Sequence, residues 1–236
     1  MTYTLVTANR NYSSWSLRPW ILMKALEIPF ADRLHPFGGL VNYDAFRGFS
    51  PTGQVPALID GERTIWDSLG IALYLADRHP GVWPAVERTA ARAFAQCAVS
   101  EMHSGFTAMR SDCPMNVGVR VRPKPMSDAL LRDIARLEEI FTEGLSRFGG
   151  PWLAGDTFCA LDAFFAPVAL RIRTYGLDVG PGQAWVARIL DHPAMKQWER
   201  EALAETWREA GHEAELAAAG TVIEDFRAAP EAAADT

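Results

Sequence analysis

Three short clusters near the N-terminus carry groups that can bind and activate a small thiol. NYSSWSLRPW at residues 11–20 places adjacent hydroxyls where a first strand should pass into a first helix. GQVP at residues 53–56 precedes a later strand, and WDS at residues 66–68 opens another helix. A hydroxyl can donate to a thiolate, an extended backbone can pair with a peptide, and a helix N-terminus attracts a carboxylate. Together the clusters indicate a site for a small anionic peptide with a thiol.

These clusters resemble those of the glutathione S-transferases. The similarity is closest to serine-type members such as the zeta class. In those members the first helix is entered through Ser-Ser and followed by an Arg, as here by Arg18. The resemblance covers the whole chain. It implies a thioredoxin-like α/β N-terminal domain followed by an all-α helical domain, with glutathione as co-substrate, no metal and a homodimeric assembly.

The resemblance also implies which hydroxyl contacts the sulfur. In serine-type members the donor lies five residues before the Arg, which gives Ser13; Ser14 is the second choice and Tyr12 the third. The alternative is that Ser13 and Ser14 only cap the helix, as such residues commonly do. Pro19 lacks an N–H, so we expect it within the first helical turn.

A hydroxyl and a helix N-terminus can together ionise the thiol of glutathione. That thiol resembles cysteine, with a pKa near ~8.5, and a downward shift of about two units corresponds to roughly 2.7 kcal/mol. A charge-assisted hydrogen bond supplies about 1.5–3 kcal/mol, and the helix terminus roughly 0.3–1 kcal/mol. The two contributions suffice without a metal or a lysine.

The other two clusters supply the expected peptide contacts. Val55-Pro56 matches the family's cis-proline, which would present the backbone of Val55 to glutathione, although X-Pro bonds are usually trans. Gln54 would reach a carboxylate or backbone group, or else is an exposed loop side chain. At the next helix start, Ser68 would bind the γ-glutamyl carboxylate and Asp67 its ammonium, and Asp67 can also cap the helix.

Candidates for a second-substrate pocket fall in the C-terminal half. His103, Phe106 and Arg110 share one face of an expected helix at i, i+3 and i+7, and Arg110 can attract an anionic electrophile. Asn116 and Arg173 complete the predicted pocket. For each Arg a structural salt bridge is the alternative, and His103 can be a hydrogen-bonded helix residue. Arg171 and Tyr175 are ambiguous in the same way.

The elements that must position these residues follow from the apolar pattern. The first 80 residues predict the order β-α-β-α-β-β-α, with strands at 3–7, 30–35, 57–59 and 63–66 and helices at 16–26, 42–49 and 68–78. HPGVWP at residues 79–84 breaks the pattern. We therefore expect a glutathione-binding domain at 1–80, a linker at 81–87, an all-helical substrate domain at 88–216 and a fraying tail at 217–236.

Within the helical domain, the small-residue face Ala91–Ala95–Met102 is either a dimer seam or internal packing. Long helices are expected around 130–148 and 161–172, the latter kinked at Pro167. The segment 152–162 resembles the family's helix-capping segment, in which Asp162 is the capping acid and Cys159 replaces the usual Ser or Thr.

Composition narrows the function class. The chain has 236 residues, 49% of them hydrophobic, and a net charge of −6 without a basic stripe, so we expect no nucleic-acid partner. No signal peptide or membrane span is visible, and three separated cysteines fit a reducing, cytoplasmic location. No CxxC, GxGxxG, HExxH or GxSxG motif occurs.

The sequence thus favours a glutathione transferase that conjugates a small electrophile or isomerises one, as maleylacetoacetate isomerases do. The alternative is a non-catalytic glutathione-binding or protein-docking module of the same fold.

Overall fold

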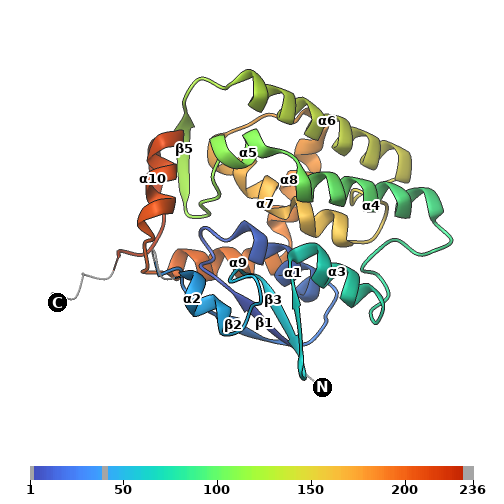
Figure 1. The fold of residues 1–236 in the computed structure, drawn as a ribbon. Coiled ribbons are helices and arrows are strands. Elements are labelled where there is room, and N and C mark those ends of the chain that lie inside the picture. Colours follow the sequence, from blue (N-terminus) through green and yellow to red (C-terminus); the bar gives the residue numbers. More distant parts are fainter. Residues whose placement is uncertain (1–2, 39–41, 231–236) are drawn as a thin grey trace.

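The computed structural model describes residues 3–38 and 42–230, and places a small α/β half beneath a larger helical half (Figure 1). The α/β half consists of β1 (Tyr3–Thr7), α1 (Ser14–Ala25), β2 (Phe30–Leu34), α2 (Asn42–Arg47), β3 (Ala57–Asp60), β4 (Arg63–Trp66) and α3 (Ser68–Ala76). This element order and the thioredoxin-like class confirm the sequence prediction. The domain boundaries themselves stay a prediction.

The four strands form one mixed sheet in the order β2-β1-β3-β4. β1 pairs with β2 in parallel and with β3 antiparallel, and β3 and β4 form the hairpin that the Asp60-Gly61 turn predicts. Leu5, Val6 and Leu58 are fully buried, so β1 and β3 form the centre of this half. The sheet order brings the loop after β1 next to the loop before β3, where two of the three polar clusters lie.

Helices α1 and α3 lie between the sheet and the helical half, and α1 packs against α7 and α9 (Figure 1). α1 begins at Ser14, which makes Pro19 its sixth residue and not a first-turn residue as expected. The missing N–H of Pro19 leaves the carbonyl of Trp15, four residues earlier, without its helical donor. Residues 16–23 are nevertheless all buried, because α1 is enclosed on several sides.

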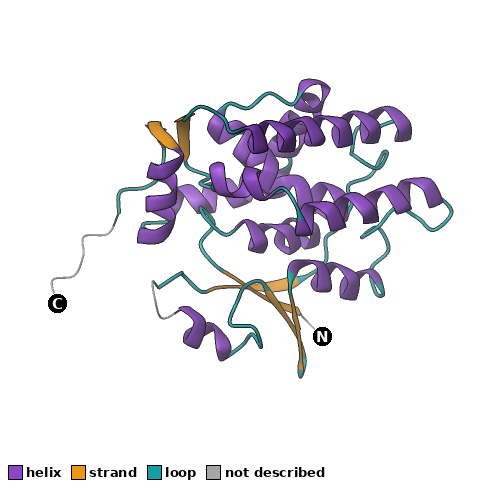
Figure 2. Cartoon of the chain, turned by 45° about the horizontal axis from the view of Figure 1, so that its top comes forward, coloured by secondary structure: helices purple, strands orange, loops and turns teal. Residues whose placement is uncertain are grey.

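The second half is rich in helices, as Figure 2 shows by colour. Its elements are α4 (Thr89–Ser104), α5 (Thr107–Asp112), β5 (Val119–Pro123), α6 (Asp128–Phe148), α7 (Ala160–Tyr175), the 3-10 turn η2 (Gly180–Gly182), α8 (Gln183–Asp191), α9 (Pro193–Ala204), α10 (Ala210–Ala219) and β6 (Gly220–Asp225). α7 is its central helix, with nearly every side chain buried. Asp162 accepts hydrogen bonds from the N–H groups of Leu153 (3.0 Å) and Cys159 (3.1 Å) and from the indole of Trp185 (2.9 Å).

The structure decides between the two interpretations of the small-residue face. Ala91, Ala95 and Met102 are buried inside the chain's own core as α4 packs on α7, which is the internal packing and not the dimer seam. The C-terminal segment does not fray at residue 217, since β6 pairs antiparallel with β5 and the Arg227 side chain binds Glu213 (2.6 Å) and Asp225 (2.7 Å). Residues 231–236 of the expected tail lie outside the described residues.

None of the helices in the described residues is long and apolar enough to cross a membrane.

Candidate functional site

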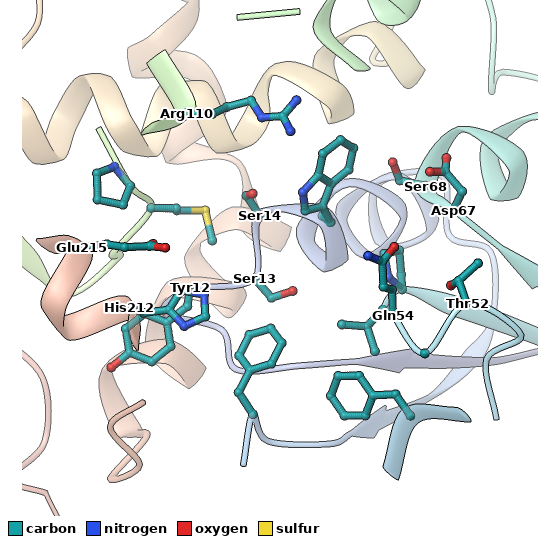
Figure 3. Close-up of a pocket in the computed structure, with 18 of the residues that line it drawn as sticks. Tyr12, Ser13, Ser14, Thr52, Gln54, Asp67, Ser68, Arg110, His212 and Glu215 are labelled. Atoms are coloured by element: carbon teal, nitrogen blue, oxygen red, sulfur yellow. The ribbon is translucent and has the colours of Figure 1, made fainter. Parts of the chain in front are cut away.

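A cavity of about 1040 Å³ lies between the two halves and gathers most of the predicted residues (Figure 3). That volume accommodates a tripeptide together with a second small molecule. Its lining comes from five regions: Tyr12–Trp15 and Phe37; Phe46 and Thr52–Pro56; Trp66–Ser68; Thr107, Arg110, Ser111, Pro114 and Met115; and Arg171, His212 and Glu215.

Ser13 lies at the centre of the cavity, immediately before α1 (Figure 3). Its side chain is 5% exposed and makes no capping hydrogen bond to α1. Instead, the Ser13 hydroxyl donates to Oγ of Ser16 (2.7 Å), which also accepts from the N–H of Ala8 (3.2 Å). This geometry counts against capping as the reason for a serine at this position.

Ser14 and Tyr12, the other two hydroxyl candidates, also line the cavity. Ser14 is half-buried at the first position of α1. The Tyr12 hydroxyl points away from the cavity in Figure 3 and donates to Glu213 (2.8 Å). Burial, followed by that hydrogen bond, raises the pKa of Tyr12 well above its ordinary value. Tyr12 is thus a poor donor to a sulfur in the cavity.

The loop before β3 forms the next part of the lining. The Val55–Pro56 peptide bond is cis, as predicted. Gln54 is exposed and lies on the cavity wall beside Thr52, a neighbour that the sequence analysis did not select (Figure 3). This loop therefore presents one long amide side chain and one hydroxyl to the cavity.

Asp67 and Ser68 close the same end of the cavity at the start of α3. Asp67 adopts φ 67°, a left-handed conformation that is strained for a residue with a side chain. One of its oxygens accepts from the N–H of Leu69 (2.8 Å), so it caps α3. Ser68 is 1% exposed, and its hydroxyl has no partner within the described residues. A buried hydroxyl without a hydrogen-bond partner at a helix N-terminus can donate to a bound carboxylate, which the backbone N–H groups of the helix also attract.

Arg110 of α5 and Arg171 of α7 line the part of the cavity that the helical half forms. The sequence analysis selected Arg110 and left Arg171 ambiguous. Arg18, behind them on α1, is 2% exposed and stacks on Trp15, its Cζ 4.0 Å from the ring centroid. Arg110 also stacks on Trp15, at 4.6 Å. The cavity thus has a polar end at α3 and a cationic end at α5 and α7.

His103 and Phe106 do not line the cavity, which corrects their assignment. The expected face of one continuous helix is lost because α4 ends at Ser104 and Phe106 takes φ 54° before α5 begins. Phe106 is buried against Phe165, with ring centroids 6.3 Å apart. His103 lies behind the lining, its Nε2 3.5 Å from Asp67 and its ring edge-on to Trp15, and burial lowers its pKa.

Asn116 and Arg173 are also outside the lining. Asn116 is buried and donates to Glu213 of α10 (3.4 Å). Arg173 pairs with Glu199 (2.7 Å) and donates to the carbonyl of Val117 (3.3 Å). Here the structural salt bridge, the alternative to a pocket role, is what the structure shows.

Helix α10 supplies two residues that the sequence analysis missed, His212 and Glu215 (Figure 3). The His212 ring stacks on Tyr12 and Phe37, with centroids 4.9 and 5.0 Å away, and its Nδ1 lies 2.6 Å from Glu209. No local motif marks this histidine, because its position depends on β5 and β6 folding α10 back over the cavity.

Thiol and metal chemistry have few candidate residues. Cys113 and Cys159 are buried, and burial raises the pKa of Cys113 to about 12. Cys97 is exposed, and none of the three is among the cavity residues. Residues 3–38 and 42–230 contain no cluster of three or more metal-ligating side chains.

The comparisons with known proteins agree with this fold. The family model for the glutathione S-transferase N-terminal domain matches residues 12–78, which include the second and third polar clusters and all of the first except Asn11. A zeta-class glutathione S-transferase of Euphorbia esula is 29% identical over 138 residues, 57% of this chain and 60% of the relative. A dichloromethane dehalogenase of Methylorubrum extorquens is 36% identical over 61 residues, 25% of this chain and 21% of the relative. The chain thus spans less than two thirds of the length of either curated relative.

Among solved structures, a glutathione transferase homologue from Burkholderia with bound glutathione has a TM-score of 0.64 and 21% identity, covering 86% of this chain and 98% of that one. A glutathione transferase F7 from Populus trichocarpa has a TM-score of 0.63 and 18% identity, covering 85% and 99%. Both likenesses concern the fold. The fold joins a thioredoxin-like half to a helical half, as in these solved glutathione transferases. Residues 12–78 of the chain match the N-terminal domain of the glutathione S-transferases.

Proposed function

We propose that the protein is a glutathione transferase in which the Ser13 hydroxyl stabilises the glutathione thiolate for attack on a small electrophile. The observation that carries this proposal is the position of Ser13: buried, central in the cavity, at the entrance to α1, and not used as a cap. Serine-type activation is also what the resemblance to the zeta class suggests.

The hydrogen-bond chain behind Ser13 supports a donor role. Ser16 accepts from the N–H of Ala8, which leaves its own hydroxyl proton free to turn toward Ser13. Hydroxyl groups rotate to suit their partners, so a bound thiolate can reverse the Ser13–Ser16 bond. Ser13 would then accept from Ser16 and donate to the sulfur, and each bond in such a chain polarises the next.

The remaining glutathione contacts follow the wall toward α3. Ser68 and the first N–H groups of α3 would bind the γ-glutamyl carboxylate, and Asp67 the neighbouring ammonium. Val55 would pair with the cysteinyl backbone, and Gln54 would bind a carboxylate or backbone group. In conjugation to an aryl chloride, the sulfur forms the new C–S bond, the C–Cl bond breaks and chloride leaves. The Methylorubrum relative's name, dichloromethane dehalogenase, fits a carbon–halogen substrate.

The test compares two adjacent serines as matched variants. Ser13→Ala should raise the pKa of bound glutathione by about 1–2 units, because one charge-assisted hydrogen bond is lost. Ser14→Ala should leave it unchanged. The measurement is the ultraviolet absorbance of the thiolate against pH, with folding checked by circular dichroism. An unchanged thiolate pKa in Ser13→Ala rejects the assignment, and a shift in Ser14→Ala alone transfers it to Ser14.

A cytoplasmic location and a homodimer belong to the same proposal, on the family resemblance. Sedimentation of the purified chain at micromolar concentration tests the dimer, and a purely monomeric profile rejects it.

A further inference from the structure

The cationic end of the cavity consists of Arg18, Arg110 and Arg171, which come from α1, α5 and α7. Trp15 links the first two, since both guanidinium groups stack on its ring. Arg18 lies in addition 5.1 Å from the ring of Phe164. Arg171 is 6% exposed and shares the cavity wall with Arg110. Two of the three positive charges thus stack on one indole, and the third lines the same cavity.

Within the described residues, none of the three arginines has a carboxylate within ion-pair distance. Nε and Nη1 of Arg18 are buried without any hydrogen-bond partner. Arg171 donates only to carbonyls, of Cys113 (2.8 Å) and Pro167 (3.4 Å). Arg110 makes two long bonds, each 3.4 Å, to the carbonyls of His103 and Gly105. Burial, followed by the neighbouring arginines, lowers the pKa of Arg18 to about 9, so it stays charged at neutral pH.

Such a cluster is costly unless an anion completes it. Buried charges are normally paired, and like charges near one another repel. The acids on the cavity wall, Asp67 and Glu215, form no ion pair with these arginines. The charge of Asp67 partly offsets the lowering of the Arg18 pKa, but its carboxylate is engaged by Leu69 and His103. The cavity itself is the remaining place from which an anion can reach Arg110 and Arg171.

We propose that the cationic end binds the carboxylate of the second substrate, a small planar aromatic or unsaturated acid. Arg110 and Arg171 contact its carboxylate, and its planar part lies along Trp15. Arg18 contributes charge from behind and holds the indole in place. Thr107 and Ser111 add hydroxyls at the rim, and Pro114 and Met115 add apolar walls. This inference rests on the proposed transferase function and names its substrate class.

Arg110 comes from the helical half, whereas the expected glutathione contacts Gln54 and Ser68 come from the α/β half. In Figure 3 Arg110 lies above Ser14, while Gln54, Asp67 and Ser68 lie to the right. A substrate carboxylate at Arg110 would therefore leave the electrophilic carbon of the same molecule near the serines.

The kinetic test uses a matched pair of electrophiles, 4-chloro-3,5-dinitrobenzoate and its methyl ester, each normalised to its uncatalysed rate with glutathione. Arg110→Gln and Arg171→Gln should each lower kcat/KM for the acid about 10- to 100-fold, as expected for a lost charge-assisted hydrogen bond. The ester should change by less than about threefold, because the arginines have no charge to bind there. Arg147→Gln, on the exposed side of α6 and paired with Glu143, is the control and should alter neither substrate.

A binding measurement separates failure of this inference from failure of the transferase proposal. Calorimetry with 3,5-dinitrobenzoate, which has no leaving group, should show binding that Arg110→Gln weakens about tenfold or more and that the neutral methyl ester does not share. Binding of this kind without turnover of either electrophile rejects the transferase and leaves the anion site. Arg171→Lys keeps a positive charge and should retain part of the affinity, which guards against a folding defect in Arg171→Gln.

Two outcomes overturn the inference. In the first, acid and ester lose kcat/KM equally in the arginine variants, which makes the cluster structural. In the second, glutathione alone displaces 3,5-dinitrobenzoate competitively, which assigns the arginines to glutathione itself.

Discussion

Arg10 and the cluster Arg18–Arg110–Arg171 are buried in opposite ways. Arg10, in the loop after β1, pairs with Asp32 and with Glu201 (3.0 Å) and lies over the ring of Trp198 at 4.5 Å. In the cluster, Arg18 and Arg110 also stack on aromatic rings, but within the described residues none of the three arginines forms an ion pair with a carboxylate. A buried cation that only stabilises the fold is normally paired with an acid of the same chain. This contrast is the reason for our proposal that the cationic end of the cavity binds an anion.

The Arg10 network also explains how the hydroxyl loop is held. The backbone N–H groups of Arg10 and Asn11 donate to Glu205, and the indole of Trp198 donates to the carbonyl of Arg10 (3.0 Å). The loop that carries Ser13 is therefore fixed to the end of α9, so the helical half positions the Ser13 hydroxyl.

The largest expected effect on stability is that of replacing Arg10, the arginine with acidic partners. Arg10→Met should lower the free energy of unfolding by about 3–5 kcal/mol, because Asp32 and Glu201 lose their buried partner. Urea unfolding of the variant beside Arg147→Met, an exposed control, gives the value. A loss below about 1 kcal/mol would contradict the structural role.

A buried acid provides an intermediate case, since Asp162 is held by neutral N–H donors and no cation. Asp162→Asn should lose about 1–3 kcal/mol at pH 7, because one donor then faces an amide N–H₂. Burial raises the pKa of Asp162 from 3.8 to about 6. Its protonated form is therefore favoured in the folded state, and its contribution to stability falls as the pH rises from about 4 to about 6, by roughly 3 kcal/mol in total.

The asparagine side chain cannot titrate, so it lacks this dependence on pH. The stability gap between wild type and Asp162→Asn, measured by urea unfolding at several pH values, should widen as the pH falls from 7 to 5. A gap that narrows over this range would show that the carboxylate is stabilised in its charged form.

The smallest effect on stability is expected for the cluster Arg18–Arg110–Arg171, which has no acidic partner within the described residues. Arg18→Met should change the stability of the ligand-free protein by less than about 1 kcal/mol, or increase it, because an uncompensated buried charge is replaced by an apolar chain of similar length. Thermal unfolding measures it. A loss as large as that of Arg10→Met would remove the distinction between the two arginine groups.

The parts of the site that the sequence predicted are those encoded by neighbouring residues. The cap at Asp67 and the seven-element order of the α/β half follow from local patterns, and the cis Val55–Pro56 bond follows from the family resemblance of its motif. The Ser13 and Ser14 roles rest on the same resemblance and stay predictions.

The parts that failed depend on distant segments or on a local break in a pattern. Arg18 and Arg171 are 153 positions apart and meet only through α1 packing on α7. The β5–β6 pairing, which folds α10 over the cavity, likewise joins segments about one hundred residues apart. His103 and Phe106 were misassigned because the left-handed turn at Phe106 interrupts an otherwise continuous helical pattern.

The measurement that tests the account most directly is a crystal structure of the protein with glutathione bound. We expect the sulfur within hydrogen-bond distance of the Ser13 hydroxyl, the γ-glutamyl carboxylate at Ser68, and no glutathione atom on Arg110 or Arg171. A sulfur beside another donor, or a glutathione carboxylate held by the two arginines, would contradict the division of the cavity into a peptide end and an acid-binding end.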